Sequence, residues 1–339
     1  MDYATIIIPT LNRANHLKRC LDSLAYNDWA KYSPLIISVD YPPSPKYEDG
    51  YQEVLKLLKA YDFSVFKSIE IFYQKRNLGP AENSMFLFNK VEENDGICVF
   101  TEDDNQFSPN FLEYINKGLE LFGEEEFVYS VNGMSDTDWY ARKCDNYIIS
   151  KLFPAYGAGF KTAKKFLVEE KARQFLLDKS NINLRNLKSL YCKNKYLFVA
   201  YITQILCTRK GLYWSKDGLL NMSDIPVSIY MHLTDYVCVV PVVSKSRTFG
   251  NDGSGVNMPS IKESKEKIID EDAHFDFVCS GNISFDDRNY KIGERFLMDS
   301  LWKWKTRISS LTKAFASLLL LYMMGKDHDK VSSILDRFK

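Results

Sequence analysis

Short apolar, β-branched runs alternate with helical patterns along the first 131 residues of the chain. The runs that predict strands are 5–8, 35–39, 69–73, 96–100 and 127–131. After the first of these runs, Leu17, Cys20, Leu21 and Leu24 recur every three or four residues, which places them on one face of a helix. Because parallel strands need crossover connections, the alternation predicts an α/β fold with a mostly parallel sheet and flanking helices.

A second amphipathic pattern, at 111, 115, 119 and 122, follows Ser108 and Pro109. It predicts a helix that Ser108 caps and that has Pro109 at its first position. Beyond residue 132 the regular alternation fades, and we expect a helix over 162–177, a strand over 236–243 and helices from about residue 294. The change in pattern predicts a catalytic domain over 1–258 and a mainly helical extension over 259–339.

An acidic triplet, Glu102, Asp103 and Asp104, follows the strand predicted at 96–100. Most acidic triplets are solvated loops, but sheets of this kind bind ligands at the carboxyl ends of their strands. Three carboxylates placed there repel one another, and a hard cation such as Mg²⁺ or Mn²⁺ is the usual compensation. A metal at this position would also stabilise a diphosphate leaving group.

Polar residues also follow the first two predicted strands. Thr10 and Arg13 follow the first strand, and Asp40 follows the second. They fit two interpretations: an ordinary capped turn, or a polar and cationic rim around a nucleotide.

Composition narrows the classes of partner and compartment. The 44 basic and 44 acidic side chains cancel, so no nucleic-acid partner is indicated. The seven cysteines are widely spaced without a C-x-x-C pair, which is typical of buried thiols in a reducing cytoplasm. Ile6–Ile8 is followed at once by Pro9, which argues against a secretory signal, and the apolar run 314–324 is too short to cross a bilayer. We therefore expect a cytoplasmic protein.

Four segments together resemble nucleotide-sugar glycosyltransferases of the GT-A fold. They are 7–13 (IIPTLNR), 76–79 (RNLG), 101–115 (TEDDNQFSPNFLEYI) and 246–255 (SRTFGNDGSG). The third segment is similar to the region around the metal-binding E-D-D of N-acetylglucosaminyltransferase I. It is also similar to the same region of the bacterial relatives of that enzyme, which resemble glycosyltransferase family 2. The resemblance covers residues 1 to about 258.

This resemblance implies an inverting, metal-dependent enzyme that moves a single sugar from a UDP-sugar to a glycan or lipid-linked acceptor in bacterial surface polysaccharide synthesis. It implies that Asp104 binds Mn²⁺ or Mg²⁺. The residues it assigns to the donor are Thr10, Arg13, Asp40, Asn77, Glu102 and Asp103.

A sugar hydroxyl needs a positioned carboxylate to accept its proton during attack. The resemblance points to Asp224, seventeen residues before Pro241, although the family's flanking tryptophans are absent, and Asp217 and Asp235 are rivals. Two other functions remain open, which are a catalytically silent protein that binds glycans or nucleotide sugars and a sugar nucleotidyltransferase.

The carboxyl-terminal helix also fits two interpretations. Aromatic and basic residues over 302–313 precede the apolar run 318–324. Such a mixture can lie on the anionic inner face of a membrane, or it can pack on the main domain or on a homodimer partner. The four histidines show no ligand spacing, and the sequence assigns them no role.

Overall fold

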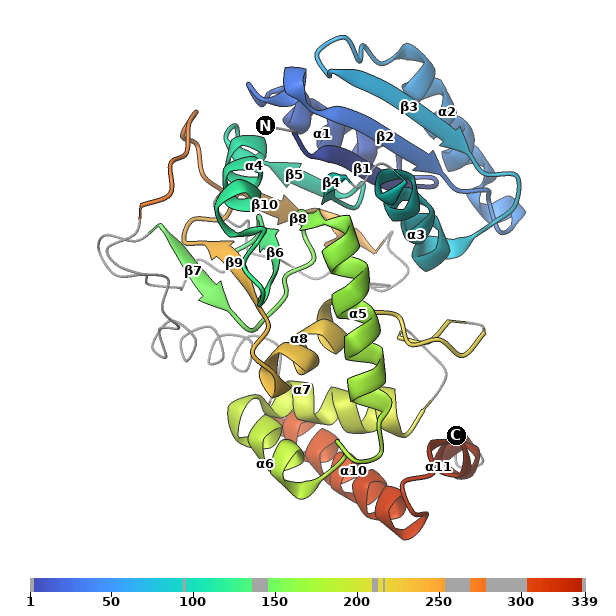
Figure 1. Ribbon diagram of the computed structural model, residues 1–339. Coiled ribbons are helices and arrows are strands. Elements are labelled where there is room, and N and C mark those ends of the chain that lie inside the picture. The colour runs from blue at the N-terminus through green and yellow to red at the C-terminus, as the bar shows by residue number, and fades with distance from the viewer. Residues whose placement is uncertain are drawn as a thin grey trace. The chain divides into compact units, whose positions relative to one another are not determined.

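The computed structural model describes residues 3–93, 96–135, 146–208, 213–215, 217–253, 269–278 and 304–336 (Figure 1). The chain forms two compact units. The first comprises Met1–Ile148, Pro154–Lys165 and Cys238–Ser284, and the second comprises Ile149–Phe153, Phe166–Val237 and Phe285–Lys339. The boundary expected at residue 258 lies outside the described residues and stays a prediction.

An eight-stranded sheet dominates the first unit, in the order β3-β2-β1-β4-β8-β6-β9-β7. Its strands are β1 Thr5–Thr10, β2 Pro34–Val39, β3 Ser68–Tyr73, β4 Ile97–Phe100, β6 Val128–Asn132, β7 Tyr147–Ser150, β8 Ala158–Lys161 and β9 Val237–Pro241. Strands β3, β2, β1 and β4 pair in parallel, whereas β8 runs antiparallel to β4 and β6. The predicted α/β fold with a mostly parallel sheet and flanking helices is confirmed.

Helices of the first unit provide the crossovers between the parallel strands. They are α1 Ala14–Ala25, α2 Glu48–Ala60, α3 Gly79–Glu92 and α4 Phe111–Phe122. The predicted face of α1 is buried as expected, and Ile6, Ile7 and Ile8 of β1 are fully buried at the centre of the sheet. This core holds the carboxyl ends of β1, β2 and β4 along one edge.

The start of α4 differs from the prediction. Asn110 and not Ser108 occupies the capping position, and no side chain caps the helix. The Ser108 hydroxyl instead donates a hydrogen bond to Asn110 Oδ1 at 2.8 Å. The acidic triplet leads first into a short strand, β5 Asn105–Phe107, which pairs antiparallel with β10 Ser246–Thr248. This small sheet attaches the segment around residue 248 to the triplet.

The second unit is helical. It contains most of α5 Thr162–Leu177 and, after it, α6 Leu184–Lys193, α7 Lys195–Ala200, the π-helix Tyr201–Leu206, α8 Asp224–Leu233, α10 Trp304–Met323 and α11 His328–Asp336. The α5 bounds match the sequence prediction. Residues 294–303, where helices were also expected, lie outside the described residues.

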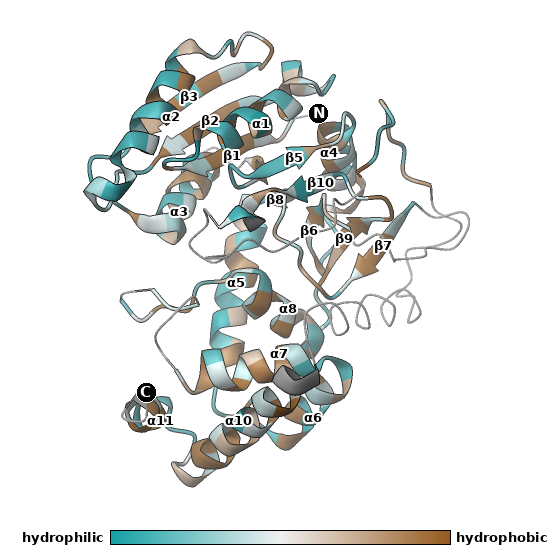
Figure 2. Cartoon of the chain, turned by 180° about the vertical axis from the view of Figure 1, so that it is seen from behind, coloured by the Kyte–Doolittle hydropathy of each residue, from teal (hydrophilic) through white to brown (hydrophobic). Residues whose placement is uncertain are grey.

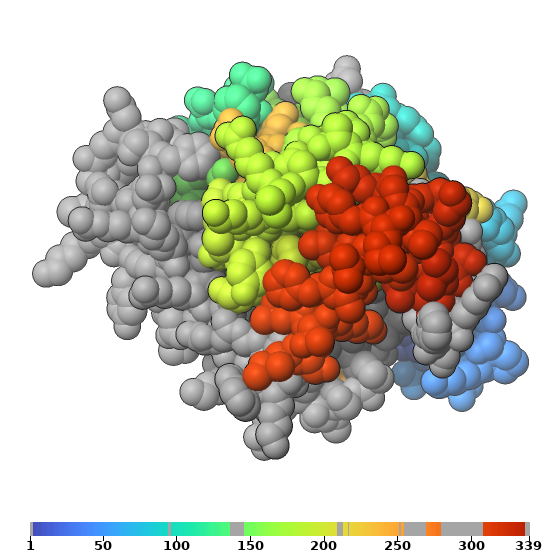
Figure 3. Space-filling model, turned by 90° about the horizontal axis from the view of Figure 1, so that it is seen from below, coloured from blue at the N-terminus to red at the C-terminus, as the bar shows by residue number. Residues whose placement is uncertain are grey.

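Helix α10 both packs within its unit and exposes apolar side chains. Ala314, Ser317 and Leu321 are buried. The helix also carries exposed apolar residues, among them Ile308, Phe315, Leu319, Tyr322 and Met323. Figures 2 and 3 show the hydrophobic positions of α10 and the surface that α10 and α11 form. Among the described residues, none of the helices is both long and apolar enough to span a membrane.

Candidate active site

The polar residues that follow β1, β2 and β4 meet at one edge of the sheet. These strands are parallel neighbours, so their carboxyl ends lie together. The Asp40 backbone N–H donates to the Thr10 carbonyl at 2.9 Å, and the Thr101 N–H donates to the Ile7 carbonyl at 3.2 Å. These bonds fix the loops that carry Asp40 and Asp103 beside the end of β1.

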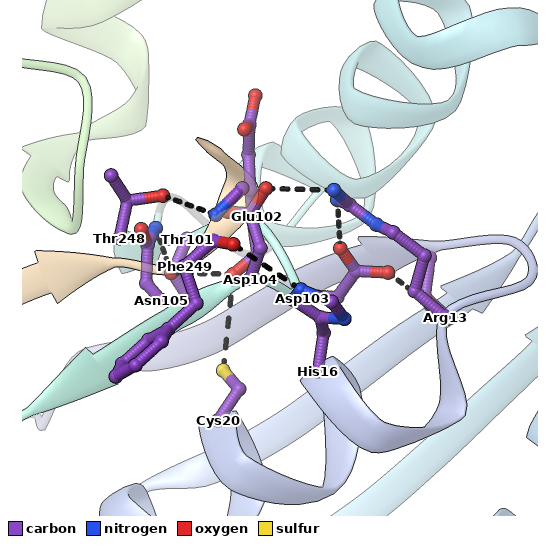
Figure 4. A network of polar contacts seen from close by, with 12 residues as sticks. Arg13, His16, Cys20, Thr101, Glu102, Asp103, Asp104, Asn105, Thr248 and Phe249 are labelled. Carbon is purple, nitrogen blue, oxygen red and sulfur yellow. Dashed lines mark hydrogen bonds and ion pairs between the residues drawn. The ribbon is translucent and has the colours of Figure 1, made fainter. Parts of the chain in front are cut away.

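Arg13 joins the last two carboxylates of the triplet (Figure 4). Its Nη1 donates to Asp104 Oδ2 at 2.8 Å, and its Nη2 pairs with Asp103 Oδ1. The Thr10 hydroxyl donates to the other oxygen of Asp103 at 2.6 Å. Asp103 and Asp104 are buried, with exposed fractions of 2% and 7%. The structure therefore brings four of the predicted site residues into one cluster.

Burial and charge act in opposite directions in this cluster. Burial raises the pKa of the Asp103 carboxyl, and the adjacent Arg13 guanidinium counteracts only part of that rise. For Arg13, burial lowers the pKa, but the carboxylates of Asp103 and Asp104 outweigh it and the net pKa is raised. With both carboxylates ionised, two negative charges face one positive charge, which leaves a buried excess of negative charge that favours a further cation.

The segment 248–252 lies against Asp104. The Phe249 N–H donates to the Asp104 carbonyl at 2.8 Å. His16 Nε2 lies 3.4 Å from the Phe249 carbonyl and 3.2 Å from Asp252 Oδ2. A Cβ atom at Gly250 would lie 2.3 Å from Asp104 Oδ2, so only glycine fits there without a shift.

Sequence reasoning gave His16, Gly250 and Asp252 no role. His16 comes from α1 and approaches a segment more than 230 residues away in the chain, so no local spacing reveals the contact. The one sequence signal for Gly250 and Asp252 is the segment 246–255 (SRTFGNDGSG), which resembles the family but gives these residues no individual function.

Replacement of Gly250 by alanine tests this packing. The added Cβ must displace the Asp104 carboxylate or the backbone beside it. We expect Gly250→Ala to weaken Mn²⁺-dependent nucleotide-sugar binding about tenfold or more while the protein stays folded, as measured by calorimetry and thermal unfolding. Gly325→Ala is the control, because Gly325 has φ +63° but open space around its Cβ position. Equal donor affinity in the two variants would contradict the assignment.

Asp40 and Asn77 form a separate polar group at the end of β2. Asp40 Oδ1 accepts the N–H groups of Tyr41 and Leu78, both at 2.8 Å. Oδ2 accepts the Gly79 N–H at 2.8 Å and the Asn77 side-chain amide at 3.1 Å. A carboxylate has about four acceptor positions. Asp40 thus uses all of them to hold the loop that opens α3, where Gly79 has φ +78°.

The side chain of Glu102 does not join those of Asp103 and Asp104. It is exposed, and its side chain points away from Asp103 and Asp104 in Figure 4. Its carbonyl accepts the Thr101 hydroxyl at 2.9 Å, and the Cys20 thiol lies 3.8 Å from the same oxygen. Glu102 thus lies outside the buried cluster of Arg13, Asp103 and Asp104.

Asp224 belongs to the second unit. It is the exposed first residue of α8, after Ser223. Desolvation of its carboxyl nevertheless raises the pKa above the ordinary aspartate range. Asp224 in turn contributes to the raised pKa of the Tyr196 and Tyr213 hydroxyls, after their own burial. The rival residues Asp217 and Asp235 are exposed and also belong to this unit.

The residues around Asp104 fit a divalent metal in one specific way. Asp104 Oδ1 is buried and has no hydrogen-bond partner in the described part of the chain. No group of three or more His, Cys, Asp or Glu side chains among the described residues is arranged to hold a metal alone. Mg²⁺ commonly binds through one or two carboxylates together with substrate phosphates. Asp104 supplies such a carboxylate.

Comparison with known proteins gives the following matches. Residues 5–167 match Glycosyl transferase family 2. Among solved structures, the mannosyltransferase PcManGT from Pyrobaculum calidifontis, in complex with GDP-Man and Mn²⁺, is 16% identical over 50% of this chain and 46% of that chain, with a TM-score of 0.34. TarS 1–349 from S. aureus, in complex with UDP-GlcNAc, is 16% identical over 50% of this chain and 48% of that chain, with a TM-score of 0.35.

The chain spans about half the length of these two structures. None of the curated proteins compared with the sequence matches it. The narrower resemblance to N-acetylglucosaminyltransferase I stays a prediction. The βα segment that carries the Arg13, Asp103 and Asp104 cluster lies within residues 5–167, the part of the chain that matches Glycosyl transferase family 2.

Proposed function

We propose that the protein is an inverting, metal-dependent glycosyltransferase that moves a single sugar from a UDP-sugar to a glycan or lipid-linked acceptor. The observation that carries the proposal is the buried cluster of Thr10, Arg13, Asp103 and Asp104 at the carboxyl edge of a parallel sheet, inside the segment that matches Glycosyl transferase family 2. UDP as the nucleotide, and bacterial surface polysaccharide as the product, rest on the sequence resemblance.

Each residue of the cluster has a distinct task in this reaction. Asp104 would hold Mn²⁺ or Mg²⁺ through its unpartnered oxygen, and the bound metal would neutralise charge on the departing diphosphate. Thr10, the last residue of β1, fixes the orientation of the buried Asp103 through its hydroxyl. Arg13 supplies a guanidinium that matches phosphate oxygens in a bidentate fashion. Glu102 is the exposed acid that contacts the donor sugar.

The nucleotide side of the donor is assigned to the Asp40 and Asn77 group. Because both oxygens of Asp40 already accept hydrogen bonds from the chain, we assign Asp40 the task of shaping the loop. Asn77 and the loop backbone then contact the nucleoside. This division gives Asp40 an indirect part in donor binding.

Asp224 is proposed as the base that takes the proton of the acceptor hydroxyl. Its raised pKa brings its proton affinity closer to neutral pH, where a carboxylate is a more effective base. Attack on the anomeric carbon from the face opposite the leaving diphosphate inverts the configuration at that carbon. The exposed apolar side of α10 is compatible with contact to a membrane that carries a lipid-linked acceptor.

A screen of nucleotide sugars, with and without Mn²⁺, tests the proposal. A ligand present at 100 times its Kd stabilises the folded state by about 2.7 kcal/mol, which thermal unfolding detects readily. We expect a UDP-sugar to raise the melting temperature only with Mn²⁺ and to be hydrolysed slowly to UDP. Stabilisation without any turnover would favour a silent binding protein. Conversion of the nucleotide sugar and added pyrophosphate into a nucleoside triphosphate and a sugar phosphate would favour a nucleotidyltransferase.

A further inference from the structure

Arg13 binds the carboxylate of Asp104, the group that the proposed function assigns to a metal. It donates to Asp104 Oδ2 at 2.8 Å and pairs with Asp103 through its other terminal nitrogen. One oxygen of Asp104, Oδ2, is therefore bound to Arg13. The other oxygen, Oδ1, has no partner among the described residues. A metal bound at Oδ1 would lie on the same carboxylate as the Arg13 guanidinium.

The charges of the cluster make these two cations compete. Two ionised carboxylates and one guanidinium sum to −1, and a divalent cation changes this sum to +1. Like charges a few ångströms apart repel strongly where water is excluded. A diphosphate that joins the metal brings negative charge back, and it offers Arg13 new acceptors for its hydrogen bonds.

Arg13 is the member of the cluster that is free to move. Its side chain is 19% exposed, compared with 4% for Asp103 and 8% for Asp104. Displacement of Asp103 would also break its bond to Thr10, and displacement of the Asp104 backbone would break its bond to Phe249. Rotation of the long and more exposed Arg13 side chain breaks only its own bonds to the two carboxylates.

We propose that Arg13 competes with the divalent metal for Asp104 in the free protein and passes its hydrogen bond from Asp104 to the donor diphosphate when metal and donor bind. This inference rests on the proposed donor and metal site. It makes metal and donor binding cooperative, because each favours the same position of Arg13. By linkage, the factor by which the metal strengthens donor binding equals the factor by which the donor strengthens metal binding.

Arg13→Gln separates the two parts of this role. Without the competing cation, Mn²⁺ alone should bind about tenfold more tightly than to the wild type, within the usual range of coupling between sites. UDP-sugar affinity at saturating Mn²⁺ should fall about tenfold or more, since the diphosphate loses its arginine. Calorimetry measures both constants. Lys18→Gln is the matched control, because it removes an exposed positive charge from α1, the helix that begins directly after Arg13, and should change neither constant.

Unchanged or weaker Mn²⁺ binding by Arg13→Gln would overturn the inference, since an arginine that only supports the carboxylates gives that result. A wild type that binds neither Mn²⁺ nor nucleotide sugars would instead overturn the proposed function. The two failures are therefore distinguishable.

A measurement on the wild type covers the case in which Arg13→Gln does not fold. The guanidinium NMR signal of Arg13, assigned by its loss in Arg13→Lys, should shift when Mg²⁺ is added alone and shift again when UDP is added. A signal that Mg²⁺ leaves in place would show that Arg13 keeps its contact with Asp104, which contradicts the exchange.

Discussion

Asp104→Asn is expected to abolish metal-dependent donor binding without destabilising the protein. The variant keeps the shape of the side chain but removes the charge through which a metal binds. It also leaves Arg13 paired one to one with Asp103, so the buried excess of negative charge disappears. We expect turnover to fall by a factor on the order of 10² or more, and the melting temperature to stay equal or rise.

Turnover, UDP-sugar affinity with and without Mn²⁺, and thermal unfolding together check this result. Asp22→Asn is the control, because Asp22 is an exposed carboxylate of the same unit that pairs with Lys18 on α1. An Asp104→Asn protein that binds and turns over the UDP-sugar as the wild type does, with the same need for Mn²⁺, would remove the metal role of Asp104. A large loss of stability would show that the carboxylate serves mainly to support the fold.

The edge of the sheet where the site lies could be predicted from sequence because its residues follow strands. Thr10, Asp40 and Asp103 each come directly or soon after a hydrophobic run, and parallel neighbours bring such positions together. The period of the apolar residues was enough to place β1, β2, β4 and α1. No knowledge of side-chain direction was needed for this level of description.

Side-chain contacts at the same edge could not be predicted in this way. The contact of His16 with Phe249 and Asp252 depends on the pairing of β5 with β10, which joins segments 141 residues apart at Gln106 and Arg247. The hydrogen bonds that the Asp40 oxygens accept from residues 41 and 77–79 also have no signal in the sequence. The role of Asp40 in holding the nucleotide stays a prediction. A carboxylate that organises a loop and one that binds a ligand look the same in a sequence.

The start of α4 shows a related limit on local signals. Ser108 and Pro109 are typical of the beginning of a helix, but the backbone first completes β5 and the turn after it. The Ser108 N–H donates to the Lys245 carbonyl at 2.9 Å, so a contact with a distant segment holds residue 108 outside the helix. Tertiary hydrogen bonding thus outweighs the local capping preference at this position.

Asp224→Asn is expected to reduce turnover by a factor on the order of 10² to 10⁴, the usual contribution of a general base. The amide keeps the size of the side chain but does not accept a proton. UDP-sugar affinity should change little, since the residues assigned to the donor belong to the other unit. Hydrolysis of the UDP-sugar, with water in place of the acceptor hydroxyl, provides the rate, and calorimetry provides the affinity.

The pH profile distinguishes a base from a residue that only supports the fold. A base works when ionised, so the rate of the wild type should fall as the pH drops below the pKa of Asp224. Because desolvation raises that pKa, the fall should begin above the pH at which an ordinary aspartate, with a pKa of about 3.9, becomes protonated. In Asp224→Asn the residual rate should lose this dependence. Asp217→Asn and Asp235→Asn serve as matched controls, and if one of them shows the flat profile and the large loss of rate, the base is that residue and not Asp224.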